Sequence, residues 1–122
     1  MSENRIVQAV MTMLSNKKNI LEVAGDGNEF YFLYKKYVWS ISPTINDHFS
    51  LCFYPHASSP FNLFDGDGVF ISDTIFIAYD TQEFGTPEAK KAFKNLHLLA
   101  RDIYFKSDEV LDDIISDGLS EE

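Results

Sequence analysis

The spacing of apolar residues changes twice along this chain, and that change constrains the fold more than any other feature. From residue 3 to residue 18 the apolar side chains recur at helical intervals. From residue 20 to residue 79 they fall in short segments separated by Gly, Pro and Asp. Helical spacing then returns after Thr86-Pro87. The order helix, strands, helix predicts an α+β fold.

The middle of the chain predicts an antiparallel meander. Strand composition is found in residues 20–24, 29–34, 37–42, 49–54, 61–64, 69–72 and 74–79, and we expect five or six strands. Gly25–Asn28 and Asp65–Gly68 are turn signals, the second within a hairpin. Lys35-Lys36 indicates either a turn or a bulge. Residues 49–54 alternate most regularly, which predicts one strand face on a core.

Two helices are expected after the strands. Thr86 is a suitable N-cap, Pro87 suits the first helical position, and a long apolar stripe runs from Ala89 to Ile103. We expect this helix to pack across the sheet. Ser107 then begins a short, acidic C-terminal helix.

Negative charge is concentrated in that last segment. The formal net charge is −9, and residues 107–122 contain seven Asp or Glu and no Lys or Arg. The acidic balance disfavours direct binding to nucleic acids or anionic membranes. Asp108, Asp112 and Asp113 occupy adjoining helical positions, so a surface that mimics nucleic-acid phosphates is one hypothesis.

The same segment is amphipathic. Its aliphatic residues are Val110, Leu111, Ile114, Ile115 and Leu119. Their spacing indicates a helix that docks on an apolar surface. We expect that surface to belong to its own domain, while a dimer contact and a groove on a partner are the alternatives.

Basic residues follow one side of the long helix. Lys90, Lys94, His97 and Arg101 are spaced i, i+4, i+7 and i+11, and Lys91 widens the row. Such a row is most often a solvated helix face. The alternative interpretation is a docking surface for something acidic: the acidic segment of the same or a neighbouring subunit, a partner, or a nucleic-acid backbone.

Aromatic residues exceed what a core of this size needs. Tyr31, Tyr34, Tyr37, Trp39 and Tyr54 all fall on predicted strands. Because Tyr and Trp are enriched at protein interfaces, Tyr31, Tyr37 and Trp39 are candidate contacts on an exposed sheet face. The pattern in residues 29–42 does not indicate which face the helices cover.

Catalytic and metal motifs are weak. His48, Cys52 and His56 are spaced four residues apart, which on a strand is about 13 Å and too far for one ion. Asp65–Gly68 lacks the closing Glu of a calcium loop. No Ser or Cys is placed beside a base. We therefore predict no metal, no cofactor and no enzymatic activity.

The length of 122 residues predicts one domain spanning 1–122, with 107–122 as its acidic segment. The lone Cys52 cannot form an internal disulfide, and the polar N-terminus does not resemble a signal peptide. The longest apolar runs are too short to cross a membrane. These features predict a soluble cytoplasmic protein.

The function predicted first is a non-catalytic protein-binding module. It would occlude or escort a macromolecular partner, as an inhibitor, an immunity or anti-defence factor, an adaptor or a chaperone does. The alternatives are a small-ligand pocket between the sheet and the long helix, which could be enzymatic, and an acidic nucleic-acid mimic. A homodimer is a further alternative, because a sheet edge or the amphipathic tail could pair with its counterpart in a second copy.

Overall fold

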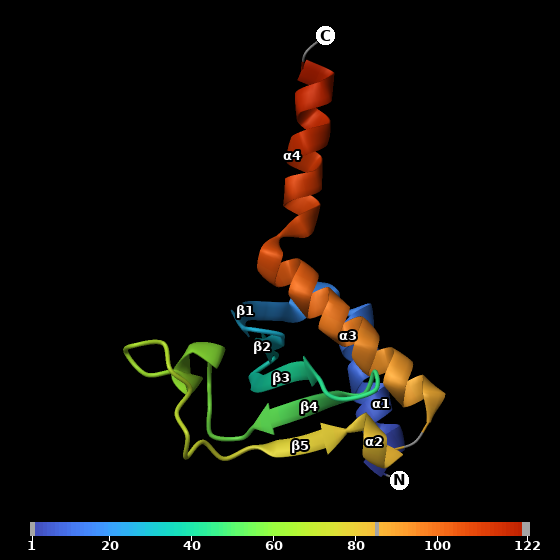
Figure 1. Ribbon diagram of the computed structural model, residues 1–122, viewed down its shortest axis with the longest axis vertical. Helices are drawn as coiled ribbons and strands as arrows, with labels where there is room; N and C mark the ends of the chain where they lie inside the picture. Colours follow the sequence, from blue (N-terminus) through green and yellow to red (C-terminus); the bar gives the residue numbers. More distant parts are fainter. Residues whose placement is uncertain (1, 85, 121–122) are drawn as a thin grey trace.

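The computed structural model describes residues 2–84 and 86–120, with side chains for all of these except residues 2–4, 108, 119 and 120. The elements in chain order are α1 (Ser2–Ser15), the 3-10 helix η1 (Lys17–Asn19), β1 (Ile20–Asp26), β2 (Glu29–Tyr34), β3 (Tyr37–Pro43), β4 (Phe49–Tyr54), the 3-10 helix η2 (Pro60–Leu63), β5 (Ile77–Asp80), α2 (Thr81–Phe84), α3 (Pro87–Phe105) and α4 (Ser107–Ser120). This order confirms the predicted α+β fold with its antiparallel meander, long helix and short C-terminal helix (Figure 1).

The five strands lie in the sheet in their sequence order, and every neighbouring pair is antiparallel. Gly27 has a φ of +65° in the turn between β1 and β2, a backbone conformation that glycine adopts without steric cost. Lys35-Lys36 forms a two-residue turn, since Tyr34 pairs directly with Tyr37 and Lys35 has a φ of +59°. The turn interpretation of this join is thus confirmed, and the bulge is excluded.

The predicted strands at 61–64 and 69–72 were wrong. Residues 60–63 form η2, which Ser59 caps by accepting a hydrogen bond from the Phe61 N–H (3.2 Å) while Asn62 accepts one from the Ser59 N–H (2.9 Å). Pro60 at the first helical position favours the same outcome. Phe64 and Phe70 form an isolated antiparallel bridge between these two segments, which lies outside the sheet.

Two other boundaries also differ from the prediction. The first helix ends at Ser15 instead of residue 18, because Asn16 leaves the helical region (φ −116°, ψ 46°) and its side chain donates to the Thr12 carbonyl oxygen (3.0 Å). The last strand begins at Ile77 instead of residue 74 and is followed directly by α2.

The main core lies between the sheet and the pair α1 and α3. Its fully buried side chains include Val10 of α1, Phe32 and Leu51 of the sheet, and Phe93 and Leu96 of α3. Thr86 caps α3 as predicted, accepting a hydrogen bond from the Ala89 N–H (3.2 Å). These side chains lie between the sheet and the long helix, where the alternative hypothesis placed a ligand pocket.

The opposite face of the sheet is also covered. Tyr31, Val38, Cys52 and Tyr54 form a second core with Leu63, and Phe64 and Phe70 from the long connection before β5 pack against it. Tyr31 and Phe64 meet edge to face, with ring centroids 5.1 Å apart. Apart from Tyr37, the surplus aromatic residues therefore serve two cores, one on each side of a single sheet.

Candidate functional site

A single residue joins α3 to α4. Lys106 adopts the left-handed conformation (φ 53°, ψ 43°), and its N–H donates to the carbonyl oxygens of Asp102 and Ile103. This arrangement caps α3 in the way that glycine usually does. The helical bonds of α4 begin at once, since the Val110 N–H donates to the Lys106 carbonyl oxygen (3.1 Å). With no linker between the helices, the backbone of Lys106 sets the direction of α4.

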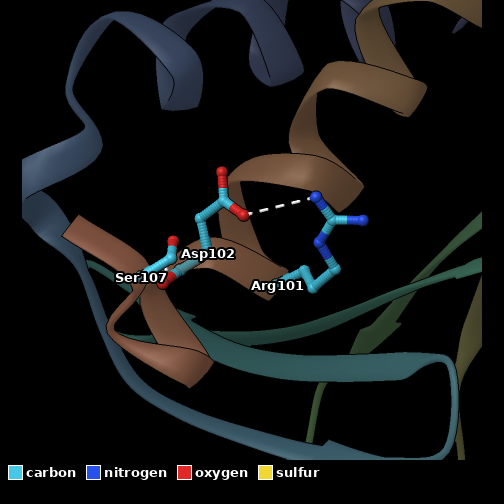
Figure 2. Close-up of polar contacts among 3 residues, drawn as sticks. All are labelled: Arg101, Asp102 and Ser107. Carbon is cyan, nitrogen blue, oxygen red and sulfur yellow. Dashed lines mark hydrogen bonds and ion pairs between the residues drawn. The ribbon is translucent and has the colours of Figure 1, made fainter. Parts of the chain in front are cut away.

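Figure 2 shows three side chains at this joint, those of Arg101, Asp102 and Ser107. The Ser107 hydroxyl donates to the Asp102 carbonyl oxygen (3.5 Å), and Nη2 of Arg101 lies 3.4 Å from Oδ1 of Asp102. Both ionic side chains are about half exposed, so the pair contributes at most ~1 kcal/mol. Among the described side chains no ion pair locks the joint, and the backbone of Lys106 sets the direction of α4.

The C-terminal helix α4 projects away from the sheet and from the other helices (Figure 1). Val110, Leu111, Ile114 and Ile115 are 53%, 56%, 60% and 61% exposed, and we call these four residues the α4 stripe. The expectation that the segment docks on its own domain was wrong. The left-handed turn at Lys106 directs α4 outward, and the end of α3 is its packing partner.

Acidic side chains border the α4 stripe. Asp113 and Asp117 follow Val110 and Ile114 by three residues, which places them on one edge of the stripe. Asp112 precedes Ile115 by three residues, so it borders the other edge of the stripe, and it is exposed. The side chains of Asp108 and Leu119 lie outside the described residues.

Two exposed aromatic residues end α3, immediately before the root of α4. Tyr104 is 41% exposed and Phe105 is 60% exposed, and both rings pack on Phe30. Gly25 makes room for this cluster, because a Cβ there would lie 3.0 Å from the Tyr104 ring. The sequence pattern predicted a turn at Gly25, and neither Tyr104 nor Phe105 was a predicted contact. An aromatic pair immediately before an acidic amphipathic segment was the available signal.

The basic row of α3 does not form one continuous surface. Lys90, Lys91 and Lys94 line a shallow groove of about 290 Å³ with Asp47 and Pro87. Arg101 lies near the joint and pairs with Asp102.

His97 of the same row is engaged inside the fold. Its Nε2 is 2.7 Å from the Asn28 carbonyl oxygen, and its ring lies 5.4 Å from Phe30 and 5.5 Å from Phe49, measured between centroids. This histidine therefore ties α3 to the turn between β1 and β2 and is not available as a basic contact.

The three aromatic residues predicted as partner contacts differ in their exposure to solvent. Tyr31 is only 2% exposed in the second core, so it offers no surface to a partner. Tyr37 is 42% exposed and meets the Phe53 ring at 6.0 Å, while the Trp39 ring lies 5.0 Å from the same Phe53. Trp39 is partly buried against the main core, and its Nε1–H is buried with no acceptor among the described residues.

A buried polar cluster that the sequence did not indicate lies in the second core. The Ser40 hydroxyl donates to Oε2 of Glu29 (2.7 Å) and lies 2.8 Å from the Tyr54 hydroxyl. Cys52 pairs with Ser40 across β3 and β4. Since Ser40 is completely buried, the cluster acts as internal hydrogen bonding in this conformation.

Burial sets the acid–base state of this cluster. It raises the pKa of the Tyr31 hydroxyl well above the ordinary tyrosine value, and the neighbouring Glu29 carboxylate adds to the effect. Burial likewise raises the pKa of the Tyr54 hydroxyl, and that of the Cys52 thiol. All three groups are therefore neutral at pH 7, which suits an apolar core.

The three residues considered as metal ligands have other environments. Nδ1 of His48 is 2.9 Å from the Thr81 hydroxyl, which also accepts a hydrogen bond from the Phe49 N–H. Cys52 is buried in the second core, and His56 lines a separate pocket with Tyr54. Across the described residues no three His, Cys, Asp or Glu side chains are grouped as a metal site.

No protein-family model, curated protein or solved structure matches this chain. Among the helices of the described residues, none has the length and apolar character needed to cross a membrane. The geometry of the chain itself is therefore what carries a functional proposal, and the α4 stripe is its most distinctive surface.

Proposed function

We propose that this chain is a non-catalytic protein-binding module whose contact surface is α4. The exposure of the α4 stripe is the observation that supports this function. Four aliphatic side chains, each more than half exposed, follow one side of a helix whose packing partner is the end of α3. An amphipathic helix with anchors at this spacing binds by laying its apolar side in a groove.

The charge of the segment specifies the kind of groove. Residues 107–122 carry seven acidic residues and no basic one. A complementary surface would have an apolar floor and a rim of Lys or Arg, because like charges across an interface are unfavourable. Occupying such a groove on another protein is how an inhibitor, an immunity or anti-defence factor, an adaptor or a chaperone would act.

Affinity capture from an extract of the native host, followed by mass spectrometry, tests this function. The baits are the full chain and a variant with Ile114→Gln and Ile115→Gln, which keeps helix propensity and removes the apolar anchors. Ile45→Gln is the matched control, since Ile45 is 66% exposed on the domain body. We expect one dominant protein with the wild type and the control, and its loss with the α4 variant. Retention by all three baits would contradict the proposal.

The hypothesis of a nucleic-acid mimic makes a different prediction in the same assay. A mimic depends on carboxylates, so Asp112→Asn with Asp113→Asn would abolish capture and Ile114→Gln with Ile115→Gln would not. Capture by a mimic would also weaken steeply with added salt.

A further inference from the structure

A groove of the kind that α4 requires is present on the chain itself. Leu99 and Ile103 of α3 lie in a groove of about 420 Å³, with Lys17 and Lys18 of η1 and Lys106 of the joint around it. Asp102 and Glu109 complete its lining. The three lysines are exposed, whereas the two aliphatic side chains are partly buried. The groove therefore combines an apolar floor with a mostly basic rim.

The groove lies at the root of α4, and this position favours one geometry for a pair of chains. In a two-fold dimer with antiparallel α4 helices, the C-terminal turns of each helix lie beside the first turns of the other. The edge carrying Asp113 and Asp117 then approaches the lysine rim of the other copy. A parallel pair would instead place the acidic turns of both helices side by side, which is unfavourable.

The exposed area of the chain is large enough for such a contact. The chain exposes 8050 Å², whereas a compact monomer of 14.0 kDa exposes about 6,700 Å². The difference, roughly 1,300 Å², exceeds the roughly 800 Å² that each partner contributes to a standard interface.

We infer that the protein which α4 binds is a second copy of this chain. In the resulting dimer the α4 stripes pack against each other in antiparallel orientation, and the acidic edge of each helix meets Lys17, Lys18 and Lys106 of the other copy. This inference rests on the proposed function, because it names the partner of the same surface.

Sedimentation velocity of the full chain tests the dimer directly. The expected mass is twice 14.0 kDa for the wild type and for Ile45→Gln, and 14.0 kDa for the chain carrying Ile114→Gln and Ile115→Gln. Circular dichroism of each variant shows whether the domain is still folded. A wild type that remains a single chain at every concentration would overturn the inference, as would a dimer unaffected by the α4 substitutions.

A charge exchange tests the lysine rim. One chain carries Asp113→Lys with Asp117→Lys, and another carries Lys17→Glu with Lys18→Glu. We expect each to lose the dimer alone, because α4 and the groove then have like charges. Mixing the two should restore a dimer, since each α4 then faces a groove of opposite charge. No dimer on mixing, or unchanged dimers of each variant alone, would refute the arrangement.

The two proposals fail in distinguishable ways. A monomeric chain that captures a different host protein, and loses it with Ile114→Gln and Ile115→Gln, would overturn the dimer and keep the protein-binding role. A monomer that captures nothing would remove both. A monomer whose α4 amides are protected from hydrogen exchange would show that α4 occupies the groove of its own chain, which also overturns the dimer.

Discussion

Replacing Ser40 by Ala should test whether the buried cluster of the second core is bonded as described. The hydroxyl of Ser40 lies 2.7 Å from Oε2 of Glu29 and 2.8 Å from the Tyr54 hydroxyl. Tyr54 is 3% exposed, so its hydroxyl would lose this partner inside the core, which costs about 1–3 kcal/mol. Glu29 is half-buried and can regain water, so its loss is smaller. We expect the free energy of unfolding to fall by about 2 kcal/mol.

Urea denaturation followed by circular dichroism measures this change. Tyr54→Phe and the double variant complete a double-mutant cycle with Ser40→Ala. Tyr54→Phe alone should cost about 1 kcal/mol, because Ser40 keeps its bond to Glu29. The double variant lacks the hydroxyl that Ser40→Ala leaves unpaired, so its cost should be smaller than the sum by about 1 kcal/mol. A loss below about 0.5 kcal/mol for Ser40→Ala, or strictly additive effects, would refute this account of the cluster.

Three further predictions concern the same fold. Burial raises the pKa of Tyr31 and Tyr54, whereas in the unfolded chain both ionise near pH 10, so the folded state holds more protons above that pH. Stability, measured as the urea midpoint, should therefore decline as pH rises above about 10, and less steeply in Tyr54→Phe. Cys52 is 8% exposed with a raised pKa, so its reaction with Ellman's reagent should be limited by opening of the fold and become fast in urea. Phe93→Ala should lower the free energy of unfolding by about 3–5 kcal/mol, against less than about 0.5 kcal/mol for the exposed Phe61→Ala.

Local signals were sufficient for most of the secondary structure. Alternation identified β4 with its observed bounds, and the Thr86-Pro87 start of α3 followed from capping chemistry alone. The strand predicted at residues 61–64 was wrong because aromatic composition favours a strand, while the cap formed by Ser59 and Asn62 favours a 3-10 helix. Composition and capping conflicted there, and capping prevailed.

The positions of the candidate contacts needed the tertiary structure. Residues 29–42 carry aromatic side chains at both odd and even positions, so the sequence pattern could not separate buried Tyr31 from exposed Tyr37. The direction of α4 depends on one left-handed residue, Lys106, and lysine gives no sequence signal for that conformation. The acidic and aliphatic composition of α4 was evident beforehand, whereas its separation from the domain was not.

The packing of α1 against α3 has a consequence for synthesis on the ribosome. The strands pair with their sequence neighbours, so the sheet can grow as the chain emerges. The main partner of α1 is α3, about 70 residues later, and translation at about 5–20 residues per second needs roughly 4–14 s to supply it. During that interval the apolar sides of α1 and the sheet lack the helix that completes their core. The nascent chain is thus most exposed to aggregation or chaperone capture just before residues 87–105 leave the ribosome.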